Sequence, residues 1–376
     1  MGTDRIVYIR TDGNSQIASG HLVRCFSVAQ ACKRLGMDVR FLVSDKESAS
    51  LLRSILPEGG ARNLPEGEFQ ILPLKNAVYN HLEQELPEVI SLLSHCHDTN
   101  VINKDIIYFL DSYYVTLNYL TALRPFAKVA YLDDLQLFDY PIDLLINYDV
   151  IPDSAMPSYK AAYQNAGQLL LGSLYTPLRS QFQNRTITVK KQVSDILITT
   201  GGSDPYHFCL KLLHSLCSSF NKNSSARLHI VIGKLNTDRN ALYSLADNYP
   251  FLLLHENVSD MASLMELCDL AVSASGTTLY ELCALGLPAI SFTMADNQLT
   301  AAKAFEDAGA IPCAGDIRTE EEKVLQTIIN FMTQMSSPGF APVERSYETR
   351  KSAHKAMRRL VDGDGAIRIA QALMKL

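Results

Sequence analysis

The chain of 376 residues is predicted to be an α/β protein with two doubly wound, parallel-sheet domains. Three observations lead to this prediction. The length suffices for two ordinary domains. Apolar strand patterns alternate with helical patterns in both halves, which is typical of parallel sheets covered by helices on both faces. The polar segment Ser180–Val193, rich in Gln, Asn, Thr and Lys, separates the two runs as an interdomain linker.

The first half is predicted to form a domain over residues 1–180. Its strand patterns are Arg5–Arg10, Asp38–Val43, Phe69–Leu72, Ile106–Leu110, Lys128–Leu132 and Leu144–Asn147. The segment His21–Leu35 has helical periodicity, with Leu22, Cys25, Ala29 and Cys32 on one face. A second helix is expected over Asn80–Cys96, kinked or divided at Pro87, because proline has no N–H to donate and clashes with the preceding turn.

The second half is predicted to form a domain over residues 194–340. Its strand patterns are Asp195–Thr200, Leu228–Ile232, Phe251–Leu253, Leu270–Ser273 and Ala289–Phe292. Residues 341–376 show an amphipathic helical pattern, and we expect this segment to cap or bridge the two domains.

Composition narrows the class of protein. With 47% hydrophobic and 20% charged residues, the chain can bury sizeable cores. The net charge of -6 argues against nucleic acid or an anionic membrane as partner. No apolar run approaches the ~20 residues of a membrane span, and no signal-peptide pattern precedes the first strand, so a cytoplasmic location is expected. The eight cysteines lack CxxC pairs, which favours reduced thiols over disulfides or zinc.

Polar clusters follow five of the predicted strands. They are the turn after Arg10, Asp111–Tyr113, Asp133–Asp134, Gly201–Asp204 and Ser275–Thr278. Ligands of open α/β sheets bind outside the carboxyl ends of the strands. The clusters therefore predict a ligand cleft between the two domains.

The most informative cluster is the turn that runs from Arg10 into the first helix. It contains Gly13 and Gly20 and ends in His21, so backbone N–H groups and one imidazole are expected to face the cleft. Helix N-termini attract anions, and an imidazole can accept a proton from water near neutral pH. His21 is thus a candidate general base, although a lone histidine is often a cap or a core residue instead.

In the second domain, Ser275–Thr278 and Gly201–Asp204 are also polar, glycine-containing turns between a predicted strand and a helix. Gly276 suits a tight turn, and the hydroxyl and N–H groups of Thr277 and Thr278 could hold a diphosphate at a helix N-terminus, with Glu281 near a ribose. An N-cap with a capping-box-like glutamate is the alternative interpretation. Asp204 could likewise be a simple N-cap.

Several other functions are disfavoured. The chain has neither a GxxxxGK[ST] loop nor a GxGxxG fingerprint, which argues against a P-loop protein and a dehydrogenase. His95 and His97 have HxH spacing but no visible third ligand. The acidic residues Asp111, Asp133 and Asp134 could bind a metal, but orienting His21, capping helices or holding sugar hydroxyls is favoured. No metal and no cofactor is therefore predicted.

Taken in order, these motifs resemble the nucleotide-sugar hydrolases of pseudaminic acid biosynthesis, which have the GT-B fold and are related to the bacterial glycosyltransferase that forms lipid II. The resemblance extends over nearly the whole chain. Its segments are Arg10–Asp12, Gly20–Arg24, Leu110–Tyr113, Leu132–Asp134, Leu171–Tyr175, Gly201–Asp204, Ser273–Thr278 with Glu281, Gly286–Pro288, Asn297–Gln298 and Val361–Ala366.

The resemblance implies metal-independent hydrolysis of a UDP-linked di-N-acetylated trideoxy sugar, in which water attacks the anomeric carbon with inversion and UDP leaves. It implies that His21 is the general base and that Tyr113 and Asn297 are further active-site residues. The residues expected to bind substrate are Arg10, Asp12, Ser15, Gly20, Asp111, Asp134, Gly202, Ser203, Ser275, Gly276, Thr277, Thr278, Glu281 and Gln298.

Some positions depart from the family pattern. Ala18 stands where the family has glycine, and Ser112 where it has histidine; insertions fall around Glu58–Glu68 and His95–Lys104. These differences point to a different sugar. A GT-B glycosyltransferase with a sugar acceptor, or a non-catalytic nucleotide-sugar-binding protein, are the alternatives, and the oligomeric state is left open. No apolar and basic patch like that of the membrane-docking lipid II enzyme is evident, which favours the hydrolase.

Overall fold

The computed structural model describes residues 5–14, 16, 17, 19–55, 69–98, 105–219, 226–336 and 343–376. The chain divides into two compact units, of which the first comprises Met1–Ser180 with Asp364–Leu376 and the second Gln181–Gly363. The predicted linker therefore clusters with the second unit, and the predicted C-terminal segment 341–376 is divided between the two units.

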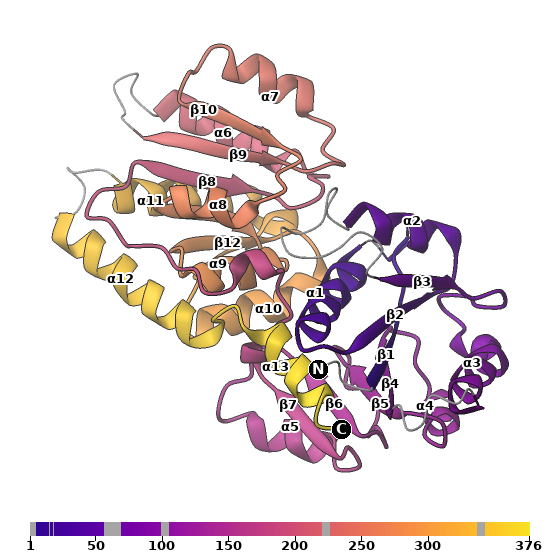
Figure 1. Ribbon diagram of the computed structural model, residues 1–376. Helices are drawn as coiled ribbons and strands as arrows, with labels where there is room; N and C mark the ends of the chain where they lie inside the picture. The colour runs from indigo at the N-terminus through magenta and orange to yellow at the C-terminus, as the bar shows by residue number, and fades with distance from the viewer. Residues whose placement is uncertain are drawn as a thin grey trace. The chain divides into compact units, whose positions relative to one another are not determined.

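The first unit is built on a seven-stranded parallel sheet in the order β3-β2-β1-β4-β5-β6-β7 (Figure 1). Its strands are β1 Arg5–Thr11, β2 Asp38–Val43, β3 Gln70–Pro73, β4 Asp105–Asp111, β5 Lys128–Leu132, β6 Leu144–Asn147 and β7 Gln168–Leu171. Its helices are α1 Gly20–Arg34, α2 Lys46–Ile55, α3 Leu86–Asp98, α4 Leu117–Leu123, α5 Met156–Ala162 and α13 Gly365–Leu373, with short 3-10 turns η1 Leu82–Glu85, η2 Ser173–Tyr175 and η3 Ser180–Phe182, the last of which spans the boundary of the units.

Alternation along β1 divides the core of this unit into two layers. Val7 and Ile9 pack with residues of α1, α2 and α13 on one face of the sheet. Ile6 and Tyr8 pack with residues of η1, α3 and α4 on the other face. Because successive side chains of a strand point to opposite faces, a sheet buried on both sides needs an apolar residue at every position, as β1 has from Ile6 to Ile9.

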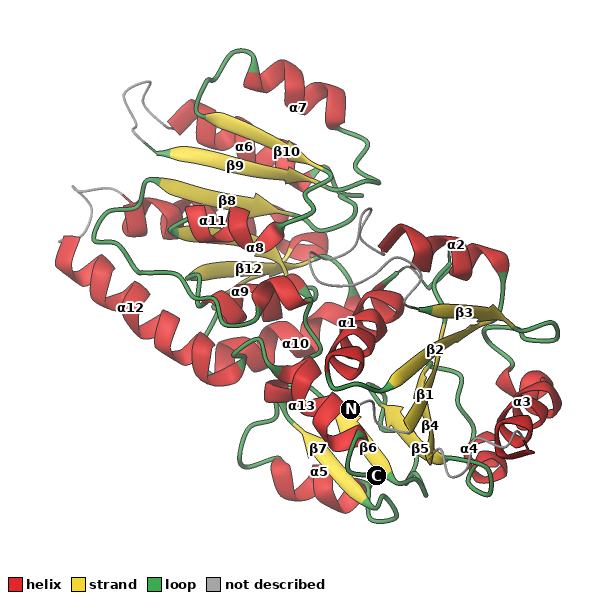
Figure 2. Cartoon of the chain, in the orientation of Figure 1, coloured by secondary structure: helices red, strands yellow, loops and turns green. Residues whose placement is uncertain are grey.

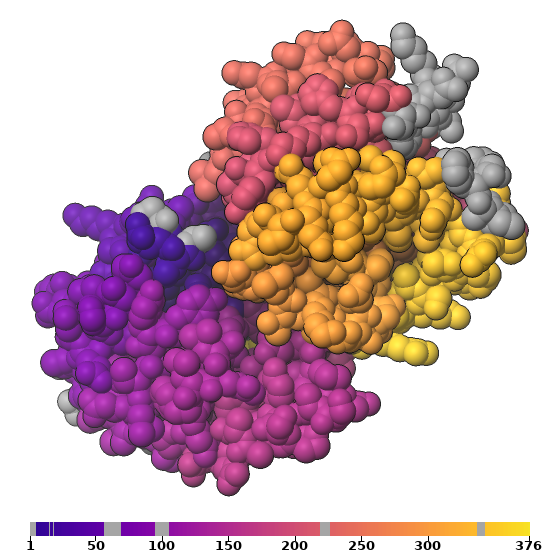
Figure 3. Space-filling model, turned by 180° about the vertical axis from the view of Figure 1, so that it is seen from behind, coloured from indigo at the N-terminus to yellow at the C-terminus, as the bar shows by residue number. Residues whose placement is uncertain are grey.

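The second unit has a six-stranded parallel sheet in the order β10-β9-β8-β11-β12-β13. Figure 2 labels β10, β9, β8 and β12 of this sheet. Its strands are β8 Asp195–Thr199, β9 Arg227–Ile232, β10 Leu252–Glu256, β11 Leu270–Ala274, β12 Ala289–Thr293 and β13 Cys313–Asp316. Its helices are α6 Phe208–Ser219, α7 Arg239–Ala246, α8 Met261–Leu267, α9 Thr278–Leu285, α10 Asp296–Asp307, α11 Ile317–Ser336 and α12 Val343–Leu360. Residues of α6 and α11 cover one face of this sheet, and α11 adjoins α12 on the surface of the unit (Figure 3).

The two doubly wound parallel sheets confirm the predicted fold class, and each predicted strand is present with bounds that differ by at most three residues. Pro87 lies in the first turn of α3, where its missing N–H costs nothing, and η1 forms the separate preceding piece. The strands β7 and β13 were not predicted.

Each sheet has one point at which the strand order reverses. In the first unit it lies between β1 and β4, and in the second between β8 and β11. Loops that leave such a pair of strands run in opposite directions and open a crevice at the carboxyl edge. The turn before His21 and the loop after Asp111 flank one reversal point; the loops Gly201–Asp204 and Ser275–Thr278 flank the other.

Over the described ranges, no helix combines the length and apolar composition that crossing a bilayer needs. The described cysteines are free thiols; they are Cys25, Cys32, Cys209, Cys217, Cys268, Cys283 and Cys313.

Candidate active site

His21 and Asp111 form a buried pair at the reversal point of the first sheet. His21 is the second residue of α1, and Asp111 ends β4, where it pairs with Thr11 of β1. The His21 Nδ1 atom lies 2.6 Å from Asp111 Oδ1. Burial by itself would raise the pKa of Asp111, but the charges of Arg24 and His21 and their hydrogen bonds outweigh it and hold that pKa well below its ordinary value.

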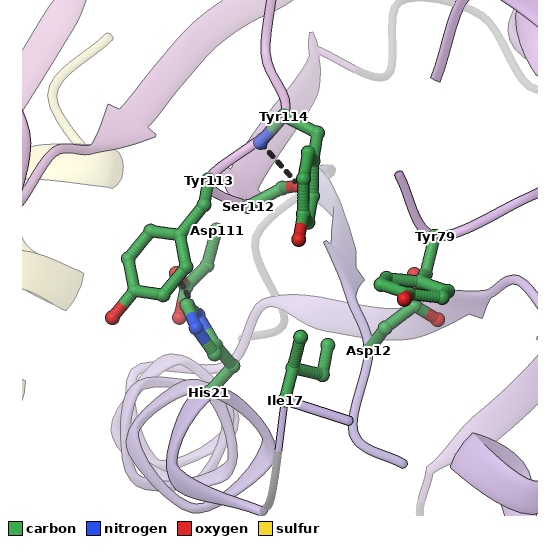
Figure 4. A pocket seen from close by; sticks show the side chains of 8 residues that line it. All are labelled: Asp12, Ile17, His21, Tyr79, Asp111, Ser112, Tyr113 and Tyr114. Carbon is green, nitrogen blue, oxygen red and sulfur yellow. Dashed lines mark hydrogen bonds and ion pairs between the residues drawn. The ribbon is translucent and has the colours of Figure 1, made fainter. Parts of the chain in front are cut away.

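The contact with Asp111 favours one tautomer of His21, because at 2.6 Å it is shorter than the 3.0 Å contact between Nδ1 and Arg24 Nη2, which can only donate. An ionised carboxylate can only accept hydrogen bonds, so Nδ1 of His21 carries the proton that it donates to Asp111. The Nε2 atom then keeps its lone pair and is the basic nitrogen. The ring of Tyr113 packs edge-on against the imidazole, with 4.5 Å between centroids and 78° between planes (Figure 4). Asp111 therefore prepares His21 to accept a proton at Nε2.

Arg24 holds this pair in place. Its Nε and Nη2 atoms donate to the two oxygens of Asp111, both at 2.6 Å. Its Nη1 atom donates to Asp134 at 2.7 Å and to the hydroxyl of Tyr148 at 2.6 Å. We predicted Asp111 and Asp134 as ligand residues but assigned Arg24 no role. Its position three residues after His21, on the same helical face, was the signal.

The His21 imidazole opens onto a pocket in the first unit. The pocket is small, with a cavity volume of about 10 Å³, and it is open to solvent. Its lining residues are Asp12, Ile17, His21, Tyr79, Asp111, Ser112, Tyr113 and Tyr114 (Figure 4). Ser112 accepts the N–H of Tyr114, and Tyr79 lies edge-on to Tyr114 with centroids 5.7 Å apart. Ile17, Tyr79 and Tyr114 are site residues that sequence reasoning missed.

Arg10 is fully buried, and its guanidinium is held by two carboxylates. Its Nε and Nη2 atoms donate to Glu85 at 2.7 and 2.8 Å, and Nη1 donates to Asp12 at 2.5 Å. Asp12 also accepts the N–H of Ser44 at 2.7 Å. The structure thus places Arg10 behind the pocket, where it positions Asp12, and not at the pocket surface where a ligand contact was expected. Glu85, 75 residues away in sequence, was not predicted.

Replacing Glu85 by leucine is expected to lower the free energy of unfolding by about 3 kcal/mol, because it leaves the Nε and Nη2 donors of a buried guanidinium without an acceptor. Urea denaturation of the full chain measures this loss. Glu83→Leu is the matched control, since Glu83 is exposed on the same turn, and it should change the stability by less than about 0.5 kcal/mol. Equal stability of both variants would contradict the ion-pair account.

The turn before α1 is shaped by Asn14, whose Oδ1 atom accepts the N–H groups of Gln16 and Ile17 at 2.9 and 3.1 Å. Gly20 is the first residue of α1, and a Cβ atom at this position would have no other heavy atom within 4 Å. Ser15 and Ala18 lie outside the described residues, as do most of the insertions at 58–68 and 95–104; within those ranges only residues 95–98 are described, as the end of α3.

In the second unit, the loop after β8 brings Gly202 and Ser203 to the carboxyl edge, where Gly202 is exposed and Ser203 half-buried. Asp204 lies four residues before the start of α6, outside the N-cap position, but its carboxylate accepts the N–H groups of Phe208 and Cys209 at 3.0 and 2.8 Å and so satisfies the first turn of the helix. Gly233 lets the next loop approach closely, since a Cβ there would lie 2.3 Å from the carbonyl oxygen of Gly201.

The loop after β11 exposes Gly276 and Thr277 at the start of α9, and Thr278 is half-buried. Thr277 occupies the N-cap position without a side-chain cap hydrogen bond, and Glu281 lies in the first turn. Ser275 is buried, and its hydroxyl donates to the carbonyl of Phe292 at 2.9 Å, so its side chain supports the loop.

Asn297 and Gln298 begin α10 at the same edge of the second sheet. Asn297 is exposed, whereas the Gln298 Oε1 atom accepts the N–H of Met294 at 2.9 Å and closes the turn after β12. Across the part of the chain that the structure describes, no group of three His, Cys, Asp or Glu side chains could hold a metal ion.

Residues 196–360 match the glycosyltransferase family 28 C-terminal domain. The chain is 30% identical over 214 residues to the spore coat polysaccharide biosynthesis protein SpsG of Bacillus subtilis, covering 57% of this chain and 58% of that protein. It is 32% identical over 145 residues to a Helicobacter pylori protein described as pseudaminic acid cytidylyltransferase and UDP-2,4-diacetamido-2,4,6-trideoxy-beta-L-altropyranose hydrolase, covering 38% of this chain and 25% of that protein. The chain thus spans only part of these relatives.

Among solved structures, MurG of Acinetobacter baumannii superposes with a TM-score of 0.60 at 15% identity, covering 99% of this chain and all of that one. UGT2 of Phytolacca americana, solved with UDP-2-fluoro-glucose and pterostilbene, gives a TM-score of 0.62 at 10% identity, with 99% of each chain covered. The chain therefore has the GT-B fold, and its second unit carries a match to the family 28 C-terminal domain.

Proposed function

We propose that the protein is a metal-independent hydrolase of a nucleotide-activated sugar. Its substrate is a UDP-linked diacetamido-trideoxyhexose, and the reaction serves nonulosonic acid or surface-glycan synthesis. The observation that carries this proposal is the buried Asp111–His21 pair, 2.6 Å apart, which directs a basic Nε2 atom to a pocket of the first unit.

In the proposed reaction, a water oxygen forms a bond to the anomeric carbon while the bond from that carbon to the diphosphate oxygen breaks. The electron pair leaves with UDP, and His21 Nε2 takes the proton of the attacking water. Asp111 stabilises the imidazolium that results. Attack from the face opposite the leaving group inverts the configuration. The Tyr113 ring keeps the imidazole in position.

UDP is a good leaving group, so its negative charge needs stabilisation by dipoles more than by an acid. The loop Gly276–Thr278 at the start of α9 offers backbone N–H groups for this role, and Gly202 and Ser203 flank the same reversal point of the sheet. We assign the diphosphate and ribose to these residues with Glu281, and keep Asn297 as a further active-site residue.

The comparisons support the class of chemistry. The printed description of the Helicobacter pylori relative includes hydrolysis of a UDP-diacetamido-trideoxy sugar, and that of the Bacillus subtilis relative places it in polysaccharide biosynthesis. A glycosyltransferase is the second candidate, favoured by the match of residues 196–360 to a glycosyltransferase domain.

Incubation of the pure protein with UDP-, GDP- and CMP-sugars, followed by NMR, separates these candidates. The hydrolase proposal predicts nucleotide release without any acceptor, with the inverted anomer formed first. Release only after an acceptor is added would favour the transferase. Tight binding of a nucleotide sugar without any release of nucleotide, with or without an acceptor, would indicate a non-catalytic nucleotide-sugar-binding protein.

After treatment with EDTA, the rate of UDP release is expected to stay within about twofold of the rate before treatment, because His21 and backbone dipoles carry the proposed chemistry. The rate is measured before and after chelation, with a magnesium-dependent nucleotidyltransferase as the control for effective chelation. A loss that added Mg²⁺ or Mn²⁺ restores would contradict the metal-independent mechanism.

A further inference from the structure

Two ion clusters, one buried and one partly exposed, border the pocket of the first unit. In the first, termed the Arg10 cluster, Arg10 donates to both Asp12 and Glu85. Their remaining partners are donors as well: Tyr119 donates to Glu85 at 2.6 Å, and Ser44 N–H donates to Asp12 at 2.7 Å. Hydrogen bonds from these donors favour the ionised form of a carboxyl group. With both carboxylates in that form, the cluster has a net charge of one negative unit.

The second cluster, termed the Arg24 cluster, joins Arg24 to Asp111 and Asp134. Arg24 again supplies one positive charge for two carboxylates. While His21 is neutral and ready to accept a proton, this cluster also has a net charge of one negative unit. Its charge is balanced only after His21 has taken up a proton.

Each cluster places one carboxylate at the pocket, Asp12 from the Arg10 cluster and Asp111 from the Arg24 cluster. The described lining includes neither lysine nor arginine, and the tyrosines Tyr79, Tyr113 and Tyr114 form its aromatic part. A carboxylate on a bound sugar would therefore meet two negative clusters without a cation to pair with it.

We infer that this pocket selects sugars by charge: it accepts a hexose whose ring substituents are neutral or a protonated amine, and it rejects a uronate. The inference rests on the proposed function and assigns selectivity to the surplus carboxylates. At a separation of about 8 Å and an effective dielectric constant of about 20, one unit charge changes affinity by about 30-fold. Screening by salt reduces this factor, so we expect at least a tenfold difference.

The test is titration calorimetry of the full chain with UDP, UDP-glucose, UDP-glucosamine and UDP-glucuronate at low ionic strength, at a pH that keeps the amine protonated. We expect UDP-glucuronate to bind at least about tenfold more weakly than UDP-glucose, and UDP-glucosamine at least as tightly as UDP-glucose. Tight binding of UDP with equal affinities for the three sugars would overturn the inference alone. Absence of UDP binding would overturn the proposed function, and this inference with it.

Asp134→Asn removes one negative charge at a partly exposed position. It should lower the ratio of the affinity for UDP-glucose to the affinity for UDP-glucuronate at least about threefold relative to the wild type. Glu85→Gln should do the same from outside the pocket, which separates charge from direct contact. Asp105→Asn is the matched control, because Asp105 begins β4 at the opposite edge of the sheet and is largely exposed. A ratio that no variant changes, or that Asp105→Asn changes equally, would overturn the assignment to these clusters.

Discussion

Replacing His21 by alanine is expected to lower the turnover of the nucleotide sugar at least about 100-fold, the usual scale for loss of a general base. The imidazole is the group whose basic nitrogen the Asp111 carboxylate prepares, and removing it leaves water without a proton acceptor at this point. Steady-state rates of UDP release measure the effect. The affinity for UDP should stay within a few-fold of the wild type, because no nucleotide contact is assigned to His21.

His214→Ala is the matched control for this variant. His214 lies exposed on α6 of the second unit, and its loss should leave the turnover unchanged. Near-normal turnover of His21→Ala, in a protein that melts like the wild type, would remove His21 from the mechanism.

Replacing Asp111 by asparagine is expected to lower turnover at least about 100-fold as well, although Asp111 acts as a positioning residue. An amide has one acceptor and one donor side, whereas Asp111 accepts from His21 at one oxygen and from Arg24 at both. In one orientation of the amide, its N–H₂ group therefore faces the Nε–H of Arg24. In the other, it faces the N–H groups of His21 and of Arg24 Nη2. When its N–H₂ group faces His21, the imidazole must carry its proton on Nε2, and the base is lost.

The same substitution should lower the free energy of unfolding by about 3 kcal/mol at neutral pH, since Arg24 loses its bidentate partner in a buried place. Because the folded-state pKa of Asp111 lies below that of unfolded aspartate, about 3.9, its stabilisation is complete above that pH and fades as the pH falls. Below about pH 4 the variant should thus lose stability less steeply than the wild type. Thermal melting over pH 3–7 measures this, and Asp105→Asn is the control on the same strand. Identical pH profiles would contradict the ionised state assigned to Asp111.

Much of the fold could be predicted from the sequence because its strands are short, apolar and separated by helical periodicity. The two missed strands lack that signal. β7 is the four-residue segment QLLL at the edge of its sheet, and β13 contains Gly315 at a φ of 125°, where the register with β12 shifts. Neither pattern differs from a loop without knowledge of the neighbouring strand.

The candidate site could be predicted where a reactive side chain lies at the carboxyl end of a predicted strand. His21 follows the turn after β1 and Asp111 is the last residue of β4, so the rule for carboxyl edges brings them together. Arg10 shows the limit of this reasoning, because nothing local distinguishes an arginine that faces a ligand from one buried against Glu85, 75 residues away. Likewise, the side chains of Ser275 and Gln298 bind backbone groups that the local sequence does not reveal. Ser275 donates to the carbonyl of Phe292 in β12, and Gln298 accepts the N–H of Met294 just after that strand.

Reaction in water enriched in ¹⁸O tests the central claim most directly, because it reports which bond breaks and what attacks it. The mechanism predicts UDP free of the label and one ¹⁸O atom in the released sugar, seen by mass spectrometry of an early time point. Label in the phosphate of the nucleotide would show attack at phosphorus and would contradict the role assigned to His21.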